Sequence, residues 1–400
     1  MRRDDGAGAR HRRRPRLGSL FQRGLRRAAE SRLVHGNAAR LLIDGPRAYP
    51  AMLELIAAAE RCIHFENYIF RGDDVGRRFA DALIERARAG VEVRVLYDWF
   101  GSIRTPRSFW NRLRDAGCEV LAFGPPSLRR PHAVLFRDHR KLLVADGRTA
   151  VIGGLCIGGE WLGDGIGPCW RDTAVLLEGP VARELDRAFI RMWRRAGGRT
   201  PTPIDTPTGD AGDVAVRVVD GPPAHARAYR LYQILAAMAG RSLYVTGAYP
   251  LAPVSLRRAL AAAARAGVDV RLLVPGRSDV PLLNQAARAH FGALLRAGVR
   301  IYEWTGPMLH AKTVVADGTL ALIGSSNLNP FSFTGNYELD VEIQDAALAG
   351  ALERQFLKDL ASAREITEEA WRARPASQRW RERLGALVLW VPYRLYGGRD

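Results

Sequence analysis

Lysine is nearly absent from this chain: only Lys141, Lys312 and Lys358 occur among 60 basic residues in 400. Arginine serves almost everywhere else that a cation is needed, although a compact ammonium and a planar guanidinium are not interchangeable at a tight site. Two of the lysines nevertheless occupy matching positions in two similar motifs. This placement indicates that Lys141 and Lys312 have a chemical role.

Two other absences narrow the class of protein. The four cysteines form no Cys-x-x-Cys pair and no Cys/His spacing typical of zinc, so we expect reduced thiols and no metal. No apolar run reaches the roughly 20 residues that span a bilayer, and the N-terminus has no apolar signal core. We therefore expect no integral membrane segment.

The composition suits an anionic partner. The formal net charge is +18, and 47% of the residues are hydrophobic, enough for one large domain or two ordinary ones. Such a basic surplus fits nucleic acid, an anionic membrane surface or a phosphorylated substrate. Composition alone leaves all three open.

The chain alternates strand-like and helix-like segments, and the order repeats. Residues 88–96, RAGVEVRVL, return as RAGVDVRLL at 265–273. This predicts an α/β fold of two similar lobes, each with a mostly parallel sheet, related by a pseudo-twofold axis with the active site at their interface. The expected segments are a basic N-terminal arm (1–36), a first lobe (37–198), a linker (199–212), a second lobe (213–362) and an amphipathic C-terminal tail (363–400). Residues 20–33 could form an amphipathic helix or belong to a solvated tail.

Two motifs carry the chemistry. They read His139-Arg-Lys141-Leu-Leu-Val-Ala-Asp146-Gly147 and His310-Ala-Lys312-Thr-Val-Val-Ala-Asp317-Gly318. Each predicts a β-hairpin with an Asp-Gly turn, and residues two apart on a strand share a face. Each histidine and its lysine should therefore point the same way. The return strand of the second hairpin should bring Ser325, Ser326 and Asn327 beside its histidine.

Two imidazoles that face each other across the lobes suit in-line attack on a phosphodiester. One neutral histidine would attack phosphorus, and the other, protonated, would donate to the leaving oxygen. The lysines would offset charge on the non-bridging oxygens, with Ser326 and Asn327 as substrate-binding candidates. Asp146 and Asp317 are also catalytic candidates, although an aspartate that begins a turn often has a structural role. This chemistry needs no metal and no cofactor.

The paired motifs resemble those of the phospholipase D superfamily over roughly residues 38–360, and the flanking stretches are most similar to its bacterial cardiolipin synthases. Those stretches include Glu66-Asn-Tyr-Ile-Phe70, Trp170-Arg-Asp172 and Asn336-Tyr-Glu338. The resemblance implies that His139 becomes a phosphohistidine and that His310 acts as general acid and then base. It also implies that Asp172 and Glu338 orient the imidazoles. One departure is Cys156, which stands where the family usually has the counterpart of Asn327.

For such enzymes the implied reaction transfers a phosphatidyl group from one phosphatidylglycerol to another and releases glycerol. The alternatives are a phospholipase D hydrolase, a nuclease of the superfamily, which the fused repeat counts against, and a membrane scaffold with inactive motifs. We expect phosphatidylglycerol and the cytosolic face of the cytoplasmic membrane as partners, with peripheral binding and no nucleic acid. The oligomeric state stays open. The apolar segment 384–396 is predicted to lie among lipid headgroups or to pack as a terminal core helix, and Pro392 to break or kink a helix there.

Overall fold

The computed structural model describes residues 18–127, 136–163, 169–201, 209–223 and 225–395. In the first half, the elements are α1 Ser19–Ala29, β1 Leu33–Ile43, α2 Asp44–Ala57, β2 Cys62–Asn67, α3 Asp74–Arg88, β3 Glu92–Asp98, α4 Arg107–Asp115, β4 Glu119–Phe123, β5 Arg137–Asp138, β6 Lys141–Ala145, β7 Thr149–Gly153, α5 Gly159–Leu162, β8 Thr173–Glu178 and α6 Val181–Arg195.

In the second half, the elements are β9 Val214–Gly221, α7 Arg227–Met238, β10 Ser242–Gly247, α8 Val254–Arg265, β11 Asp269–Pro275, α9 Pro281–Arg288, α10 Phe291–Leu295, β12 Arg300–Trp304, β13 Lys312–Ala316, β14 Leu320–Gly324, α11 Pro330–Thr334, β15 Asn336–Gln344, α12 Ala346–Leu360, β16 Ala363–Ile366, α13 Glu368–Arg372 and α14 Ala376–Leu395.

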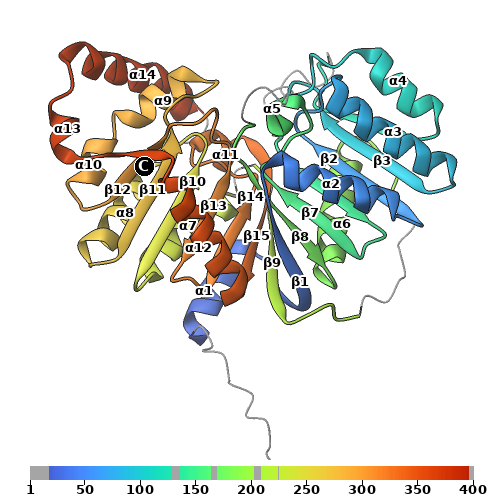
Figure 1. Cartoon of the computed structure of the whole chain (residues 1–400), viewed down its shortest axis with the longest axis horizontal. Coiled ribbons are helices and arrows are strands. Elements are labelled where there is room, and N and C mark those ends of the chain that lie inside the picture. The colour runs from blue at the N-terminus through green and yellow to red at the C-terminus, as the bar shows by residue number, and fades with distance from the viewer. Residues whose placement is uncertain (1–17, 128–135, 164–168, 202–208, 224, 396–400) are drawn as a thin grey trace, which may run out of the picture.

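The described strands form one continuous mixed sheet with helices on both faces (Figure 1). Its order is β16-β12-β11-β10-β13-β14-β15-β9-β1-β8-β7-β6-β2-β3-β4. Outward from the central β9–β1 pair, the same sequence of strands occurs on both sides: β15, β14, β13, β10, β11 and β12 match β8, β7, β6, β2, β3 and β4. The α/β class and the two similar halves are therefore confirmed.

The expectation of mostly parallel pairing is wrong. Parallel pairs are limited to β2-β3-β4, β10-β11-β12 and the short β5–β15 contact. All the strands between β2 and β10 pair antiparallel. The reason is connectivity: strands joined by a helix can run parallel, whereas the hairpins that hold the motifs join neighbours by short turns and must run antiparallel.

The fold extends beyond both expected lobe boundaries. Residues 19–29, expected in the basic arm, form α1, and its Leu25, Ala28 and Ala29 lie in the core of the second half. This i, i+3, i+4 spacing gives the helix an apolar stripe to bury. Residues 363–372, expected in the tail, supply β16, which pairs with β12, and the buried Trp371 of α13. Much of the expected arm and linker lies outside the described residues.

The two halves share a core. One cluster of buried side chains combines α6 and β6–β8 of the first half with β9, β13–β15 and α12 of the second. It includes Phe189 and Trp193 of α6 and Leu352 of α12. Because this apolar surface is buried only when the halves are together, the hydrophobic effect holds them in one fixed arrangement.

Candidate active site

Each His-x-Lys motif leads into a β-hairpin, as predicted. β6 pairs antiparallel with β7, and β13 with β14. The turn residues have positive φ angles: 54° and 62° at Asp146 and Gly147, and 53° and 64° at Asp317 and Gly318. A type I′ turn requires this left-handed pair, which Asp-Gly adopts readily. The turns therefore fix the register of both motifs.

The aspartates of these turns lie far from the histidines. The Asp146 carboxylate accepts three hydrogen bonds from the backbone N–H groups of residues 60–62, at 2.9, 2.8 and 2.9 Å. Asp317 accepts the equivalent three from residues 240–242, at 3.0, 2.8 and 3.0 Å. A five-residue strand lies between each turn and its histidine. At about 3.3 Å per residue, the strand alone is roughly 16 Å long. Asp146 and Asp317 thus anchor the turns to β2 and β10, and the structure does not bring them to the chemistry we expected them to share.

The start of each motif is held by the opposite half of the molecule. The His139 backbone N–H donates to the Tyr337 carbonyl at 3.0 Å, and that of His310 to the Arg171 carbonyl at 2.7 Å. Both histidines are nearly buried, with 7% and 5% of their surface exposed. The two motifs therefore belong to one site built across the lobe interface.

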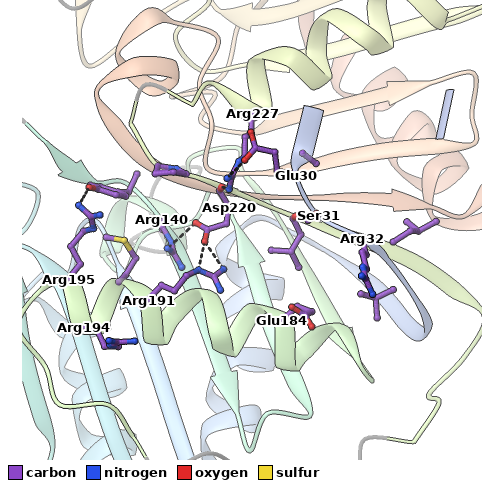
Figure 2. A pocket seen from close by; sticks show the side chains of 17 residues that line it. Glu30, Ser31, Arg32, Arg140, Glu184, Arg191, Arg194, Arg195, Asp220 and Arg227 are labelled. Atoms are coloured by element: carbon purple, nitrogen blue, oxygen red, sulfur yellow. Dashed lines mark hydrogen bonds and ion pairs between the residues drawn. The ribbon is translucent and has the colours of Figure 1, made fainter. Parts of the chain in front are cut away.

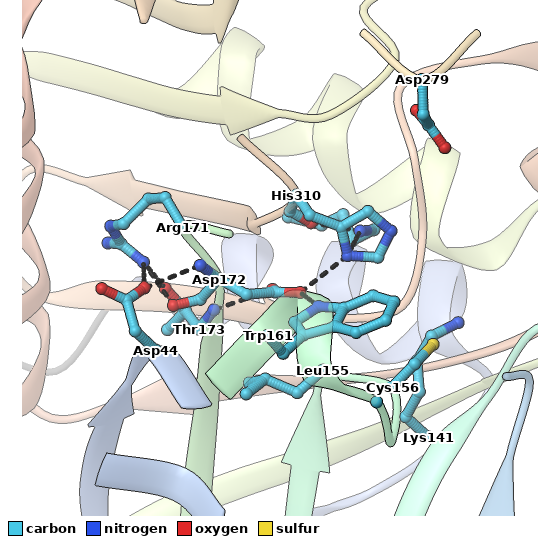
Figure 3. A network of polar contacts seen from close by, with 12 residues as sticks. Asp44, Lys141, Leu155, Cys156, Trp161, Arg171, Asp172, Thr173, Asp279 and His310 are labelled. Atoms are coloured by element: carbon cyan, nitrogen blue, oxygen red, sulfur yellow. Dashed lines mark hydrogen bonds and ion pairs between the residues drawn. The ribbon is translucent and has the colours of Figure 1, made fainter. Parts of the chain in front are cut away.

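The orienting carboxylates are crossed between the halves. His310 Nδ1 lies 2.7 Å from an oxygen of Asp172, which belongs to the first half (Figure 3). His139 Nδ1 lies 3.0 and 3.1 Å from the two oxygens of Glu338, which belongs to the second half. A carboxylate accepts from Nδ1–H and thereby leaves the Nε2 lone pair for the substrate. The sequence singled out the four residues but not this crossing.

Each carboxylate is itself held by a further donor. The Trp161 indole N–H donates to Asp172 at 2.9 Å, and the Thr173 backbone N–H donates at 2.8 Å. The Ser325 hydroxyl donates to Glu338 at 2.5 Å. Ser325 was expected beside the second histidine, and instead it supports the partner of the first. These bonds fix the carboxylates and hence the planes of both imidazoles.

The two carboxylates differ in charge. Burial alone would raise the pKa of Asp172, but the positive charges of His310 and Lys312 hold it at about 2. Burial raises the pKa of Glu338 to about 7 despite the nearby Lys141. At neutral pH, Asp172 is therefore a full carboxylate, whereas Glu338 is ionised only in part.

The environments of the two imidazoles also affect their pKa values differently. Burial, followed by the charges of Lys141 and Lys312, lowers the pKa of His139 well below its ordinary value. Burial and Lys312 also lower the pKa of His310, but Asp172 opposes them. His139 is accordingly a neutral imidazole with a free lone pair, and His310 is the one whose partner stabilises a proton on it.

Both motif lysines are buried beside their histidines, with 3% and 2% of their surface exposed. Each ammonium donates to the backbone carbonyl of its own histidine, and Lys312 Nζ also lies 2.9 Å from His310 Nδ1. Burial lowers the pKa of Lys312 to about 8. Each lysine is thus held next to the histidine of its own motif.

The two substrate-binding candidates differ in availability. The Ser326 hydroxyl donates to Asp340 at 2.5 Å and its backbone N–H to the same carboxylate at 3.1 Å. Among the described residues, the buried Asn327 Oδ1 has no hydrogen-bond partner. Asn327 therefore has a polar atom that a ligand could bind, whereas the hydroxyl of Ser326 already donates to Asp340.

Cys156 is completely buried in the core of the first half. Burial raises the pKa of its thiol, and the side chain lies beside Lys141 (Figure 3). A neutral thiol therefore occupies the place expected for an amide, and it is a weaker hydrogen-bond partner for a phosphate oxygen.

Aromatic rings enclose both imidazoles, and the sequence reasoning assigned them no role. The Tyr68 ring lies edge-on to His139, with centroids 4.8 Å apart. The rings around His310 are Trp161, Trp170 and Tyr249, at 5.4, 5.7 and 6.3 Å. Tyr68 and Trp170 lie in stretches that carried the family resemblance and could have been found there, whereas Trp161 and Tyr249 stand in no motif.

Arginines of the first half form ion pairs with Asp220 of the second half (Figure 2). Arg140, between the first motif's His and Lys, is fully buried, 3.1 Å from Glu66 and 3.4 Å from Asp220. Arg191 of α6 also pairs with Asp220, at 2.6 Å, beside a cavity of about 1120 Å³. Because Asp220 belongs to β9, these pairs fix the first motif against the second half. In the part of the chain that the structure describes, no group of three or more His, Cys, Asp and Glu side chains is placed to hold a metal.

Comparisons with known proteins agree with this arrangement. A family model described as "Cardiolipin synthase, PLD-like domain" matches residues 52–193 and 233–360. The cardiolipin synthase of Alkalihalophilus pseudofirmus is 33% identical over 359 residues, covering 87% of this chain and 71% of that protein. The major cardiolipin synthase ClsA of Bacillus subtilis is 34% identical over 362 residues, covering 88% and 75%.

Among solved structures, phosphatidylserine synthase from Haemophilus influenzae superposes with a TM-score of 0.72 at 14% identity, covering 94% of this chain and 99% of that one. Polyphosphate kinase from Porphyromonas gingivalis gives 0.58 at 13% identity, covering 89% and 53%. At these identities, the likeness shows the shared fold of two similar halves.

Proposed function

Because this chain belongs to the cardiolipin synthase family of phospholipase D-like proteins, we propose that it joins two phosphatidylglycerol molecules into cardiolipin and releases glycerol. It is a phosphatidyltransferase of the cardiolipin synthase type. The observation that carries the proposal is the crossed pair of histidines, each with Nδ1 on a buried carboxylate of the other half.

In the first step, Nε2 of His139 attacks the phosphorus of one phosphatidylglycerol. A P–N bond forms as the bond between phosphorus and the glycerol headgroup oxygen breaks, and His310 gives its proton to that oxygen. The low pKa of His139 supports this assignment because a nucleophilic imidazole must be neutral. The fully charged Asp172 supports His310 as the acid because it stabilises the protonated imidazole.

In the second step, a glycerol hydroxyl of another phosphatidylglycerol attacks the phosphohistidine. His310, now neutral, takes the hydroxyl proton, the P–N bond breaks and His139 is restored. Lys141 and Lys312 offset the charge that develops on the non-bridging oxygens, and the unpaired Asn327 oxygen can accept a bond from the acceptor hydroxyl. The low exposure of both imidazoles favours transfer over hydrolysis, because it limits the water that can reach the intermediate.

The protein surface that we propose to dock on the membrane contains exposed apolar side chains from both halves. On α14, Trp380, Leu384, Leu387 and Val388 are 70%, 60%, 62% and 49% exposed, and their spacing places them on one helical face. The opposite face packs on α9, where Glu382 accepts a bond from Arg288 at 3.1 Å. The described part of α14 therefore has one exposed apolar face, which could lie among lipid headgroups, and one face that packs on the second half as a terminal helix. The helix runs to Leu395, so Pro392 does not end it; the side chains of residues 390–396 lie outside the described part.

The first half contributes Phe100 and Ile103, both 56% exposed, on the loop after β3. β3 runs parallel to β2, whose last residue, Asn67, pairs with Lys141. This loop therefore leaves the sheet at the edge where the first motif begins. None of the helices in the described part of the chain combines the length and the apolarity of a membrane span. Together with the net charge of +18, these side chains support peripheral docking on the anionic cytosolic face of the cytoplasmic membrane.

The test is to incubate the protein with phosphatidylglycerol vesicles and to identify the products by mass spectrometry. Cardiolipin together with glycerol is expected, and neither should form with His139→Ala or His310→Ala, whose folding is checked by circular dichroism. Phosphatidic acid without cardiolipin would show a hydrolase, and an active histidine variant would overturn the shared site.

A further inference from the structure

An apolar cavity of about 430 Å³ lies between α14 and the second half. One wall is the connection from β10 into α8, with Leu251, Pro253 and Val254. The facing wall is α14, with Ala386 and Leu389. Ligand sites commonly measure roughly 300 to 1,000 Å³, so this cavity suits one slender apolar group better than a whole two-chain lipid.

Two residues that line the cavity are close in sequence to residues of the active site. Leu251 follows two residues after Tyr249, whose ring lies 6.3 Å from that of His310. Pro330, also in the cavity wall, follows three residues after Asn327. The cavity therefore lies near His310, so a ligand bound in it could extend to the second histidine.

The charged residues of the cavity wall are all basic. Among the described residues that line it, Arg257 and Arg383 are the ionised groups and none is acidic. His290 completes the set, and burial, with a smaller effect of Arg257, lowers its pKa to about 4, so it is neutral at physiological pH. Apolar walls with cations but no anions complement an apolar chain that bears a phosphate.

The described residues at the corresponding position of the first half pack differently. There the segment after β2 packs into a cluster of rings, with Phe70 centred 5.7 Å from both Phe109 and Trp110. All three side chains are buried. Rings therefore occupy this position in the first half, whereas the second half has the cavity, which can serve one of two otherwise similar substrates.

We propose that this cavity binds one acyl chain of a phosphatidylglycerol while its headgroup reacts between the histidines. The inference rests on the proposed function. Raising a lipid until its phosphorus reaches buried imidazoles withdraws its upper methylenes from the bilayer, and each methylene exposed to water disfavours the complex about fourfold. The cavity shelters those methylenes, and α14 brings it to the membrane through the exposed side chains on its outer face.

The experiment uses phosphatidylglycerol with a photoreactive diazirine in one acyl chain, in vesicles with the full-length protein. After irradiation, mass spectrometry should find the label on two segments, 251–257 and 383–389. Ala386→Trp, which fills the cavity, should remove the label from 251–257. The matched control is Ala376→Trp, an exposed position on the same helix outside the cavity wall, and it should keep the label.

Activity gives a second readout. With long-chain phosphatidylglycerol, Ala386→Trp should lower kcat/KM at least about tenfold, while hydrolysis of bis(4-nitrophenyl) phosphate, which has no acyl chain, stays within about twofold. Label confined to exposed residues such as Trp380 and Val388, or unchanged by Ala386→Trp, would overturn the cavity. The labelling of the unaltered protein tests the cavity even if Ala386→Trp does not fold. Labelling of 251–257 without any cardiolipin would support the cavity and refute the proposed reaction instead.

Discussion

Replacing the turn aspartates, Asp146 and Asp317, should weaken folding and leave the chemistry intact. Each carboxylate accepts three backbone hydrogen bonds of 2.8 to 3.0 Å. A bond to a charged group contributes about 1.5 kcal/mol or more when buried, and less here because both aspartates are only half-buried. The left-handed backbone adds about 1 to 2 kcal/mol for a residue that tolerates it poorly.

Aspartate to alanine at either turn should therefore lower the free energy of unfolding by about 3 to 5 kcal/mol. Asparagine tolerates positive φ and keeps one acceptor oxygen, so Asp146→Asn and Asp317→Asn should lose only about 1 to 2 kcal/mol. For Asp317 the backbone bonds outweigh burial and hold the pKa below its ordinary 3.8. A depressed pKa stabilises the fold above the ordinary value, so the loss in Asp317→Asn should shrink as the pH falls below about 3.8.

The assay pairs urea unfolding with turnover of bis(4-nitrophenyl) phosphate, normalised to folded protein. The asparagine variants should keep turnover within about threefold of the unaltered protein. If an asparagine variant keeps its stability but loses turnover by a hundredfold or more, that aspartate takes part in the chemistry and the geometric reasoning is wrong.

Three further results are expected. Asp172→Asn should lower turnover by about a hundredfold or more because it removes the charge that stabilises protonated His310, whereas Glu338→Gln, which replaces a partly ionised group, should lose only about tenfold; equal losses would contradict the division of labour. Burial raises the pKa of Asp340 to about 7, so the native state binds more protons than the unfolded state between pH 3.8 and 7, and stability falls across that range. Asp340→Asn should therefore gain about 1 to 3 kcal/mol relative to the unaltered protein between pH 5 and pH 8, measured by urea unfolding; a difference that does not grow with pH would refute this. Turnover should persist in excess chelator because Lys141 and Lys312 supply the positive charge, and activity restored only by added metal would count against the mechanism.

The local structure was predictable because it depends on local signals. The apolar spacing and the Asp-Gly turns predicted both hairpins, and the repeat predicted two equivalent halves. The central antiparallel pairing was not predicted, because alternation of strands and helices says nothing about which strands meet at the centre. β16 was missed, and α1 was expected only as one of two alternatives for residues 20–33, because short elements gain their stability from packing on a neighbour that the sequence does not identify.

The site residues were predictable singly but not as pairs. Asp172 and Glu338 were placed by resemblance, and neither spacing nor periodicity indicates that each orients the histidine of the other half. That crossing depends on where the chain passes between the lobes, at the contacts of His139 with Tyr337 and of His310 with Arg171. The ring of Trp161 is placed by the same long-range packing.

The central claim is that both histidines act in one site, with His139 as the nucleophile. The most direct measurement mixes the protein with phosphatidylglycerol vesicles, quenches at alkaline pH, where phosphohistidine survives, and maps the modified peptide by mass spectrometry. A phosphatidyl adduct on His139, absent in His139→Ala, is the predicted result. An adduct on His310, or one that persists in His139→Ala, would contradict the account.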